Sequence, residues 1–469
     1  GIFAPLPGHD ALHPLPPYRL EGVRPRPRGA APALDEHRDD TAPRPGTAPG
    51  RPWPLRFEGL RVLDVTSMWA GPVVGQVLAA LGADVVHVES IQRLDLGRLK
   101  VDAAYGLPQW WERAPNWFMV NTDKRDLTLD LSSPRGQELM RALLPHCDVL
   151  VENFSPRVFD HFGLTEHEVR ALNPDIVFAR MPAFGLDGPW RDNVGFAQTM
   201  EQASGMAWVT GHVEDEGPSV PRGPCDPLAG FHALFAVLVA LWKRARGGGG
   251  SFLELAMAES ALNVTAELVL EHSGNATVLE RTGNRGPDAA PQGLYRCGDG
   301  AWLAVSIGPP EQWRAAVAVL GPPSVAGGDL GELDDLARRH AVHDALDAWV
   351  GGWAAGRDAP GAADELVRAG VPAATLTDPR RAHEHPQLAA LGYFEAVEHP
   401  VVGTHLAPSL PFRYRSVPRW VRKHSPLLGQ HNGEVLGGIL GLGPEELARL
   451  ERDGVIGDRP LGSNPAFDL

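Results

Sequence analysis

The chain has 469 residues, 43% of them apolar and 22% charged, which is ordinary for a soluble globular protein of two or three domains. A net charge of −15 argues against nucleic-acid binding through phosphate contacts. Three scattered cysteines (Cys147, Cys225, Cys297) provide neither a disulfide framework nor a zinc site, so we expect a cytoplasmic protein without a metal. No 18-residue run is free of charge, Gly and His, and the N-terminus has no basic region before an apolar core. We therefore expect neither a membrane span nor a secretory signal.

The first 55 residues differ in character from those that follow. They are rich in Pro, Arg, Ala and Gly without periodicity, which is typical of a disordered leader. From Leu60 onward, apolar runs of strand length alternate with helical patterns, which predicts a parallel sheet covered by helices on both faces. The expected strands are 60–66, 83–89, 148–152 and 175–179, and the expected helices are 72–81, 133–144 and 165–172.

The turn after the first expected strand, residues 66–72, contains no G-x-G-x-x-G loop. A nicotinamide dehydrogenase would normally carry that glycine fingerprint at this turn. No Walker loop, H-E-x-x-H or G-x-S-x-G motif occurs elsewhere in the chain, which argues against the commonest nucleotide, zinc and serine-hydrolase sites.

Asp226 belongs to the stretch 224–230, which runs into the apolar segment 231–242, and it is followed by Pro227. The pair predicts a helix with Asp226 at the N-cap and Pro227 at the first helical position. A carboxylate there faces unpaired N–H groups and the positive end of the helix dipole, so it stays ionised and suits an acyl-aspartate mechanism. A plain helix cap is the alternative, and the neighbouring thiol of Cys225 is a second candidate nucleophile.

A second domain follows the long apolar helix. Strand patterns on either side of Gly298-Asp299-Gly300 predict a hairpin, and helical patterns run on to about Ala369. From about Leu388 the pattern indicates a return to the first domain. The predicted organisation is a leader at 1–55, a large domain at 56–260, a linker at 261–290, a small domain at 291–375, a return segment at 376–455 and a tail at 456–469.

A series of short motifs in fixed order resembles the family III CoA-transferases, the CaiB/BaiF group that includes formyl-CoA transferase, carnitine dehydratase and α-methylacyl-CoA racemase. The resemblance covers roughly residues 56–455. The motifs are residues 63–66 with 70–72, 81–89, 121 with 124–125 and 127–130, 148–156, 184–185 with 188–189, 283–285, 370–372 and 426–429.

The resemblance implies a large Rossmann-like α/β domain, a small α/β domain and a dimer of interlocked rings. It also implies that the enzyme moves CoA from an acyl-CoA to a small carboxylic acid, with Asp226 as the nucleophile that forms an aspartyl intermediate. The CoA contacts that we carry over or expect nearby are Met68, Trp69, Ala70, Leu129, Asn153, Phe154, Arg93, Arg125 and Phe196.

The chain departs from the family pattern at several positions. Phe196 takes the place of the histidine that serves as a second base in the racemases, and a phenylalanine cannot carry a proton. The positions of the cations that hold the CoA phosphates in formyl-CoA transferase are Ser90, Ser132, His161 and Gly195 here. Replacement cations are available nearby at Arg93, Arg98, Arg125 and Arg157.

The leader repeats part of the return segment. Residues 17–20 and 32–37 match residues 411–414 and 426–431 at a constant offset of 394. The repeat indicates a tandem-lobe origin, or a tail that is ordered because it docks on the large domain.

Three alternatives to CoA transfer stay open: isomerisation or dehydration of a thioester, transfer from a carrier-protein thioester, and an idle lobe that stabilises a partner. The partner would be a second copy or a related lobe.

Overall fold

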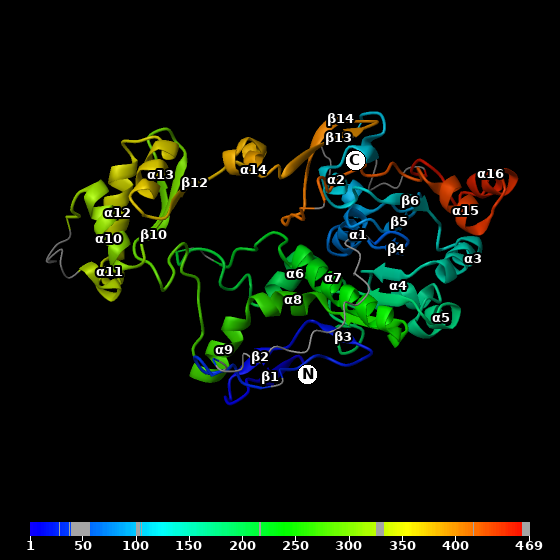
Figure 1. Cartoon of the computed structure of the whole chain (residues 1–469), viewed down its shortest axis with the longest axis horizontal. Helices are drawn as coiled ribbons and strands as arrows, with labels where there is room; N and C mark the ends of the chain where they lie inside the picture. The colour runs from blue at the N-terminus through cyan, green and yellow to red at the C-terminus, as the bar shows by residue number, and fades with distance from the viewer. Residues whose placement is uncertain are drawn as a thin grey trace. The chain divides into compact units, whose positions relative to one another are not determined.

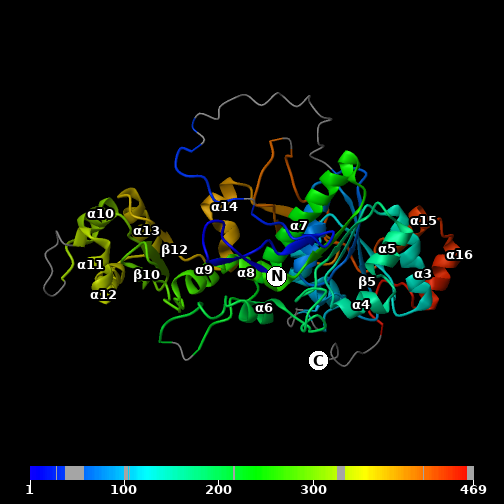
Figure 2. The ribbon, with the colours of Figure 1, turned by 90° about the horizontal axis from the view of Figure 1, so that it is seen from below.

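A computed structural model describes residues 1–27, 29–36, 38, 57–99, 104, 106–214, 217–324, 333–415 and 417–461. The chain divides into two compact units, shown in Figures 1 and 2. The first unit comprises Gly1–Ala207, Val220–Leu279 and Gly392–Leu469, and the second comprises Trp208–Ser219 and Glu280–Leu391. The predicted small domain, 291–375, lies within the second unit.

The first unit is built on a seven-stranded sheet, in which six parallel strands confirm the predicted βα alternation. The seventh strand, β3, is antiparallel and pairs with β9 at one edge. In sheet order the strands are β3 (Tyr18–Leu20), β9 (Ser251–Leu255), β8 (Val177–Arg180), β7 (Val149–Glu152), β4 (Arg61–Val65), β5 (Asp84–Glu89) and β6 (Arg125–Thr128).

Helices cover both faces of this sheet, and an apolar core fills each side. One core contains α1 (Ala70–Ala80), α6 (Ala197–Ala203), α7 (Cys225–Lys243) and α8 (Met257–Val264). The other contains α3 (Pro134–Leu143), α4 (Pro156–His161), α5 (Glu166–Leu172), α15 (Asn432–Leu440) and α16 (Pro444–Arg452). Among the described residues, this unit also contains η1 (Leu96–Arg98), η3 (Trp110–Glu112), α2 (Pro115–Val120), η4 (Leu144–His146), η5 (Arg244–Gly248) and α9 (Ala266–Asn275).

The long helix α7 begins earlier than predicted. Its N-cap is Pro224, so the prediction of Asp226 as the cap is wrong and Asp226 lies inside the first turn. The cap comes instead from Glu201 of α6, whose buried carboxylate accepts hydrogen bonds from the N–H groups of Gly223 and Cys225 at 2.8 and 3.3 Å. A side chain distant in sequence therefore sets this helix start.

By length and composition Cys225–Gly248 qualifies as a membrane-crossing helix, the one candidate within the described residues. However, 56% of its apolar window is buried within the structure, where α7 packs on α1 and the sheet. Gly230 permits this packing, because a Cβ there would lie 2.6 Å from the carbonyl oxygen of Ala70. We interpret the segment as the core helix of the first unit.

The described part of the leader is ordered, so the disorder expected from its composition is wrong there. It forms a hairpin of β1 (Phe3–Pro5) and β2 (Leu12–Pro14) and then contributes β3 to the main sheet. The contacts of residues 12–24 with the first unit agree with the alternative of a docked, ordered tail, which we predicted for residues 10–40. Residues 39–56 of the leader lie outside the described residues.

The second unit contains an antiparallel sheet of β10 (Gln292–Arg296), β11 (Trp302–Ser306) and β12 (Ala373–Thr375), which confirms the predicted hairpin. The chain then returns to the first unit through the hairpin of β13 (Phe394–His399) and β14 (Gly403–Pro408). Helices that the structure describes in the second unit are α10 (Pro310–Leu320), α11 (Leu336–Ala341), α12 (His343–Ala354), α13 (Ala359–Arg368), η7 (Pro379–Glu384) and α14 (Pro386–Ala390), the segment 325–332 lying outside the described residues.

Candidate active site

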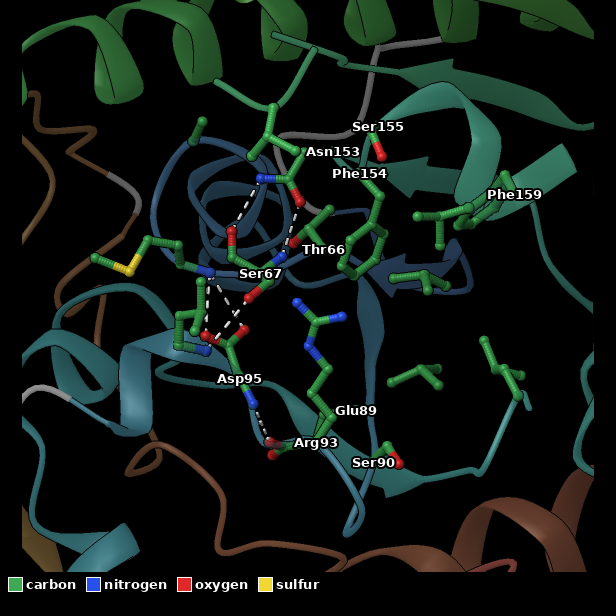
Figure 3. Close-up of a pocket in the computed structure, with 18 of the residues that line it drawn as sticks. Thr66, Ser67, Glu89, Ser90, Arg93, Asp95, Asn153, Phe154, Ser155 and Phe159 are labelled. Atoms are coloured by element: carbon green, nitrogen blue, oxygen red, sulfur yellow. Dashed lines mark hydrogen bonds between the residues drawn. The ribbon is translucent and has the colours of Figure 1, made fainter. Parts of the chain in front are cut away.

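A cavity of about 490 Å³ opens at the carboxyl ends of the central parallel strands of the first unit (Figure 3). Open α/β sheets bind their ligands at this edge. The turn after β4, the loop after β5 and the segments after β6 and β7 all contribute lining residues. Side chains widely separated in the sequence therefore meet at one site.

The turn after β4 is fixed by hydrogen bonds to its neighbours, drawn as dashed lines in Figure 3. Ser67 N donates to Asn153 Oδ1 at 2.8 Å, and Asn153 Nδ2 donates back to Ser67 O at 2.9 Å. Asp95 Oδ1 accepts from the main-chain N–H groups of Met68 and Gly97. Met68 has a φ of 76°, a left-handed conformation that costs energy for a side chain of this kind and is held here by these contacts.

Asp226 lines the same cavity from the first turn of α7. The residue is 9% exposed, and the apolar residues Ala70, Ala183 and Met257 line the cavity with it. The close approach of α1 and α7 at Gly230 brings the first turns of both helices to this place. A carboxylate here is exposed to the cavity and lies at the positive end of a 19-residue helix.

Cys225 does not provide an alternative nucleophile. Its side chain is fully buried, and burial together with the charges of Asp226 and Glu201 raises the pKa of the thiol to about 12. A thiol with this pKa stays protonated at neutral pH, and the thiolate is the reactive form.

Most of the predicted CoA contacts come together around the cavity. Trp69 and Arg125 are the exceptions: the Trp69 ring packs against the core and beside Gly223, and Arg125 forms an ion pair with Asp84 at 2.6 Å. Neither residue lines the cavity. The predicted contacts that do are Met68, Ala70, Arg93, Leu129, Asn153, Phe154 and Phe196, and the polar positions Ser90 and Ser132 lie among them.

Two cations are available at this cavity. Arg93 and Arg157 are exposed lining residues, and neither takes part in an ion pair within the described part of the chain. Figure 3 shows Arg93 reaching into the cavity. Arg98, by contrast, is fully buried and bound by Glu89 and Glu112 at 2.8 and 2.7 Å, so it is not available to a ligand.

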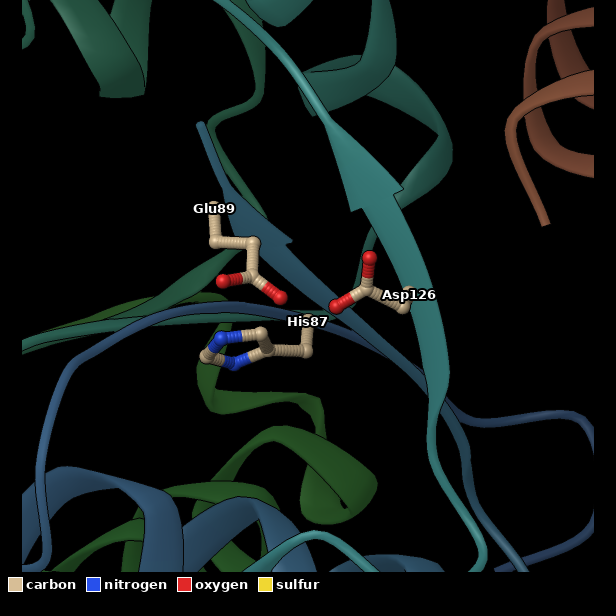
Figure 4. Close-up of side chains that lie close together, drawn as sticks. All are labelled: His87, Glu89 and Asp126. Atoms are coloured by element: carbon tan, nitrogen blue, oxygen red, sulfur yellow. The ribbon is translucent and has the colours of Figure 1, made fainter. Parts of the chain in front are cut away.

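At one wall of the cavity, the lining residue Glu89 forms a buried cluster with His87 and Asp126 (Figure 4). The charge of Arg98 lowers the pKa of Glu89 despite burial, whereas burial and the charge of Glu89 raise the pKa of Asp126 well above its usual range. The guanidinium of Arg98 already lies 3.7 Å from Asp126 Oδ2. The cluster therefore contains its own counter-cation, and we treat it as a structural charge network rather than a metal site.

Several residues that organise the site were not predicted. Glu201 and Asp95 act through main-chain N–H groups, and no local motif distinguishes them from other acidic residues in the sequence. Glu259, at the start of α8, forms an ion pair with Arg24 and does not line the cavity.

The family model of CoA-transferase family III matches residues 57–432. The chain is 30% identical over 403 residues to a succinyl-CoA–D-citramalate CoA-transferase of Chloroflexus aurantiacus, covering 86% of this chain and 98% of that protein. It is 29% identical over 464 residues to a probable CoA-transferase of Mycobacterium tuberculosis (Rv1866), covering 96% of this chain but only 57% of that protein. A crystal structure of a CaiB/BaiF family protein from Brucella suis matches with a TM-score of 0.72 and 26% identity over 82% of this chain and 99% of that one.

The chain belongs to CoA-transferase family III, the CaiB/BaiF family. It is a family III CoA-transferase-like enzyme, and its substrates fall in the family's general class of CoA thioesters and carboxylic acids.

Proposed function

We propose that this enzyme moves CoA from an acyl-CoA to a small carboxylic acid through a covalent intermediate on Asp226. The carboxylate attacks the thioester carbonyl carbon, the C–S bond breaks, and an aspartyl anhydride forms as CoA thiolate leaves. The thiolate attacks the aspartyl carbonyl, giving an aspartyl-CoA thioester and the free donor acid. The acceptor carboxylate attacks that thioester, the C–S bond breaks, and a second anhydride forms between Asp226 and the acceptor as CoA thiolate leaves. The thiolate then attacks the acceptor's acyl carbon, the anhydride C–O bond to Asp226 breaks, and the product thioester and the free Asp226 carboxylate result.

The observation that carries this assignment is the place of Asp226 in the cavity, on the first turn of α7. The helix dipole favours the ionised carboxylate that the attack requires. In the proposed binding mode, the thioester lies against Asp226, Ala70 and Met257, and the pantetheine arm passes Met68 and Phe196.

Arg93 and Arg157 take the CoA phosphates in this binding mode. Both are exposed cations on the cavity lining, and phosphate binding by arginine is strengthened by charge and paired hydrogen bonds. Their position favours CoA over a carrier-protein thioester, whose pantetheine lacks the adenosine phosphates. It also argues against the alternative of a catalytically idle lobe, because such a lobe would need no cations at this cavity. Phe196 on the lining favours acyl transfer over two-base racemisation, because it cannot transfer a proton. The cytoplasmic setting and the interlocked dimer stay predictions.

Trapping with hydroxylamine tests the intermediate. The protein is incubated with succinyl-CoA, formyl-CoA and a wider acyl-CoA panel in the presence of hydroxylamine, and peptides are analysed by mass spectrometry. We expect a hydroxamate on the peptide that contains Asp226, and no hydroxamate in Asp226→Asn, because an amide oxygen is a far weaker nucleophile than a carboxylate.

Asp175→Asn is the matched control. Asp175 is exposed and lies two residues before β8, at the amino ends of the parallel strands, so this variant should be labelled like the parent. Labelling that persists in Asp226→Asn, or that is absent from the parent with every thioester, would contradict the proposed covalent mechanism.

A further inference from the structure

A second cavity of the first unit lies apart from the candidate active site. It has a volume of about 520 Å³ and is lined by the hairpin of β13 and β14, by residues 419–431 of the return segment and by Lys124, which precedes β6. All of its lining belongs to the first unit, and none of the described residues lines both cavities. Its volume is in the range of small-molecule binding sites.

The lining of this second cavity is rich in cations, although the whole chain carries a net charge of −15. Lys124, Arg419, Arg422 and Lys423 line it, together with one carboxylate among the described residues, that of Glu398. We call it the basic cavity. A concentration of cations in an acidic protein indicates a local preference for an anion.

The basic cavity also differs from the candidate active site in its polarity. Its described lining has two apolar residues, Ala396 and Val397, so the apolar parts of a thioester would find few partners there. Four further side chains on the lining can form hydrogen bonds, those of Thr404, His424, Gln430 and His431. A compact polar ligand therefore suits this cavity better than an acyl or pantetheine chain.

Lys124 is part of the cavity wall rather than a ligand-binding group. Its side chain is fully buried, and Nζ donates to Asp64 Oδ2, Pro72 O and Asn121 Oδ1 at 2.7, 2.9 and 2.8 Å. The carboxylate of Asp64 neutralises its charge. The other three cations of the lining are the ones that a ligand can reach.

Arg422 and Lys423 present two cationic side chains from adjacent residues. Arg422 Nη2 donates to Ala79 O, whereas its Nε lies 3.6 Å from Asp123 Oδ1, which is beyond hydrogen-bond distance. Asp123 instead accepts hydrogen bonds from the main-chain N–H groups of both residues. The Arg422 side chain is 43% exposed, and the exposed Lys423 takes part in no ion pair within the described part of the chain.

Two further donors of the basic cavity are held in place by the protein. Arg419 Nε donates to Glu395 Oε2 at 3.0 Å and Nη2 donates to Ala396 O, while half of its side chain stays exposed. His431 Nδ1 accepts from Asp126 N at 3.1 Å, so the neutral ring carries its proton on Nε2 and can donate it to a ligand.

We propose that the basic cavity binds a small organic anion with at least two negatively charged groups, which are carboxylates or phosphates. Arg419 and Arg422 bind its oxygens through charge-assisted hydrogen bonds, Lys423 adds a third positive charge, and His431 Nε2–H is a neutral donor. The cations come from three side chains, so an anion with several charges engages more of them than a singly charged one. This site is separate from the CoA phosphate contacts proposed for Arg93 and Arg157.

Calorimetric titration of the full chain with pyrophosphate, citrate and acetate tests the proposal. At least one of the two multivalent anions should bind about tenfold or more tightly than acetate, because a further charge-assisted hydrogen bond contributes about 1.5–3 kcal/mol. Binding of pyrophosphate alone would identify a phosphorylated ligand, and binding of citrate alone a polycarboxylate. A chain that binds neither multivalent anion at millimolar concentration would overturn the proposal.

Removing two of the cations assigns the binding to this cavity. The double variant Arg422→Gln and Lys423→Gln should lose about tenfold or more in affinity for the bound anion. Arg368→Gln with Arg452→Gln is the charge-matched control, because both residues are exposed and line neither cavity. If the first double variant does not fold, Lys423→Gln alone, which changes one exposed side chain, should still lose about threefold. Equal losses in the control and in the cavity variants would overturn the assignment.

A third double variant separates this site from the candidate active site. Arg93→Ala with Arg157→Ala removes the proposed CoA phosphate contacts and should leave the affinity for the multivalent anion unchanged. Loss of anion binding in this variant, with full binding in the Arg422→Gln and Lys423→Gln chain, would place the anion in the active site and overturn the proposal. Labelling of Asp226 with hydroxylamine does not depend on any of these results, so the two proposals fail separately.

Discussion

Glu201 positions Asp226, the proposed nucleophile, although it does not itself line the cavity. Its side chain is fully buried, and one oxygen accepts from the N–H groups of Gly223 and Cys225, which flank the start of α7. Asp226 follows directly, so its place in the cavity depends on this cap.

Removing the Glu201 carboxylate should therefore destabilise the fold and weaken acylation together. Glu201→Ala leaves two buried N–H groups without an acceptor, at a cost of about 1–3 kcal/mol. Glu201→Gln keeps one acceptor oxygen and should recover most of that loss. Urea denaturation gives the stability, and the rate of hydroxamate formation at Asp226 gives the positioning. If the alanine and glutamine variants lose the same stability and rate, the capping role is wrong.

The proposed phosphate contacts of Arg93 and Arg157 can be tested by comparing an acyl-CoA with a pantetheine-only thioester. If they bind the CoA phosphates, removing either guanidinium should cost about 1.5–3 kcal/mol, or roughly ten- to a hundredfold in KM for an acyl-CoA. The corresponding acyl-pantetheine has no adenosine phosphates, so its KM should change little. The measurement is steady-state kinetics of Arg93→Ala and Arg157→Ala with both substrates.

Arg452→Ala is the control for this pair, because Arg452 is an exposed cation on α16 that does not line the cavity. Its KM for both substrates should match that of the parent. Equal losses for acyl-CoA and acyl-pantetheine in Arg93→Ala would show that the arginine supports the cavity wall rather than the phosphates.

Among the secondary-structure elements, the sequence correctly predicted those strands and helices that are determined by the local pattern of apolar residues. The sequence predicted β4, β5 and β7 within about a residue of their observed bounds. Each is a short, nearly continuous apolar run, which is typical of a parallel strand buried on both faces. The start of α7 was missed because its cap, Glu201, lies 24 residues away from Cys225 and becomes a neighbour only in the fold.

The leader is a second element whose structure depends on contacts with residues that are distant in the sequence. Its composition resembles that of a disordered segment, yet three residues complete the main sheet because β9 has an open edge and Glu254 and Glu259 face Arg19 and Arg24. The internal repeat was the one sequence signal that pointed to order. At the candidate site, the family resemblance predicted Asp226 and most of the residues that line the cavity. It did not predict that Arg125 lies outside the cavity lining, because the ion pair with Asp84 forms only in the folded chain.

Across the whole molecule, several buried or half-buried histidines make stability depend on pH. Burial is the first cause that lowers the pKa of His232, His343, His399 and His431. The shift is largest for His399, whose pKa falls to about 4. Its Nδ1 accepts from the N–H groups of Val401 and Val402, and the neighbouring rings are Phe118 of α2, His405 of β14 and His424. The charges of His424, His405, Arg98 and Arg113 add to the shift.

The sign of the pH effect follows from this shift. Between pH 6.5 and about 4 the unfolded chain binds a proton at His399 that the folded chain does not, so the free energy of unfolding falls as the pH falls through this window. His399→Gln removes this titration and keeps a neutral acceptor. Between pH 7.5 and 5 the Tm of the parent should therefore drop by about 2–4 °C more than that of the variant. The exposed His146 provides the control, because His146→Gln should follow the parent profile. Parallel profiles for the parent and His399→Gln would show that other groups, among them the Glu89–Asp126 network, set the acid stability of this fold.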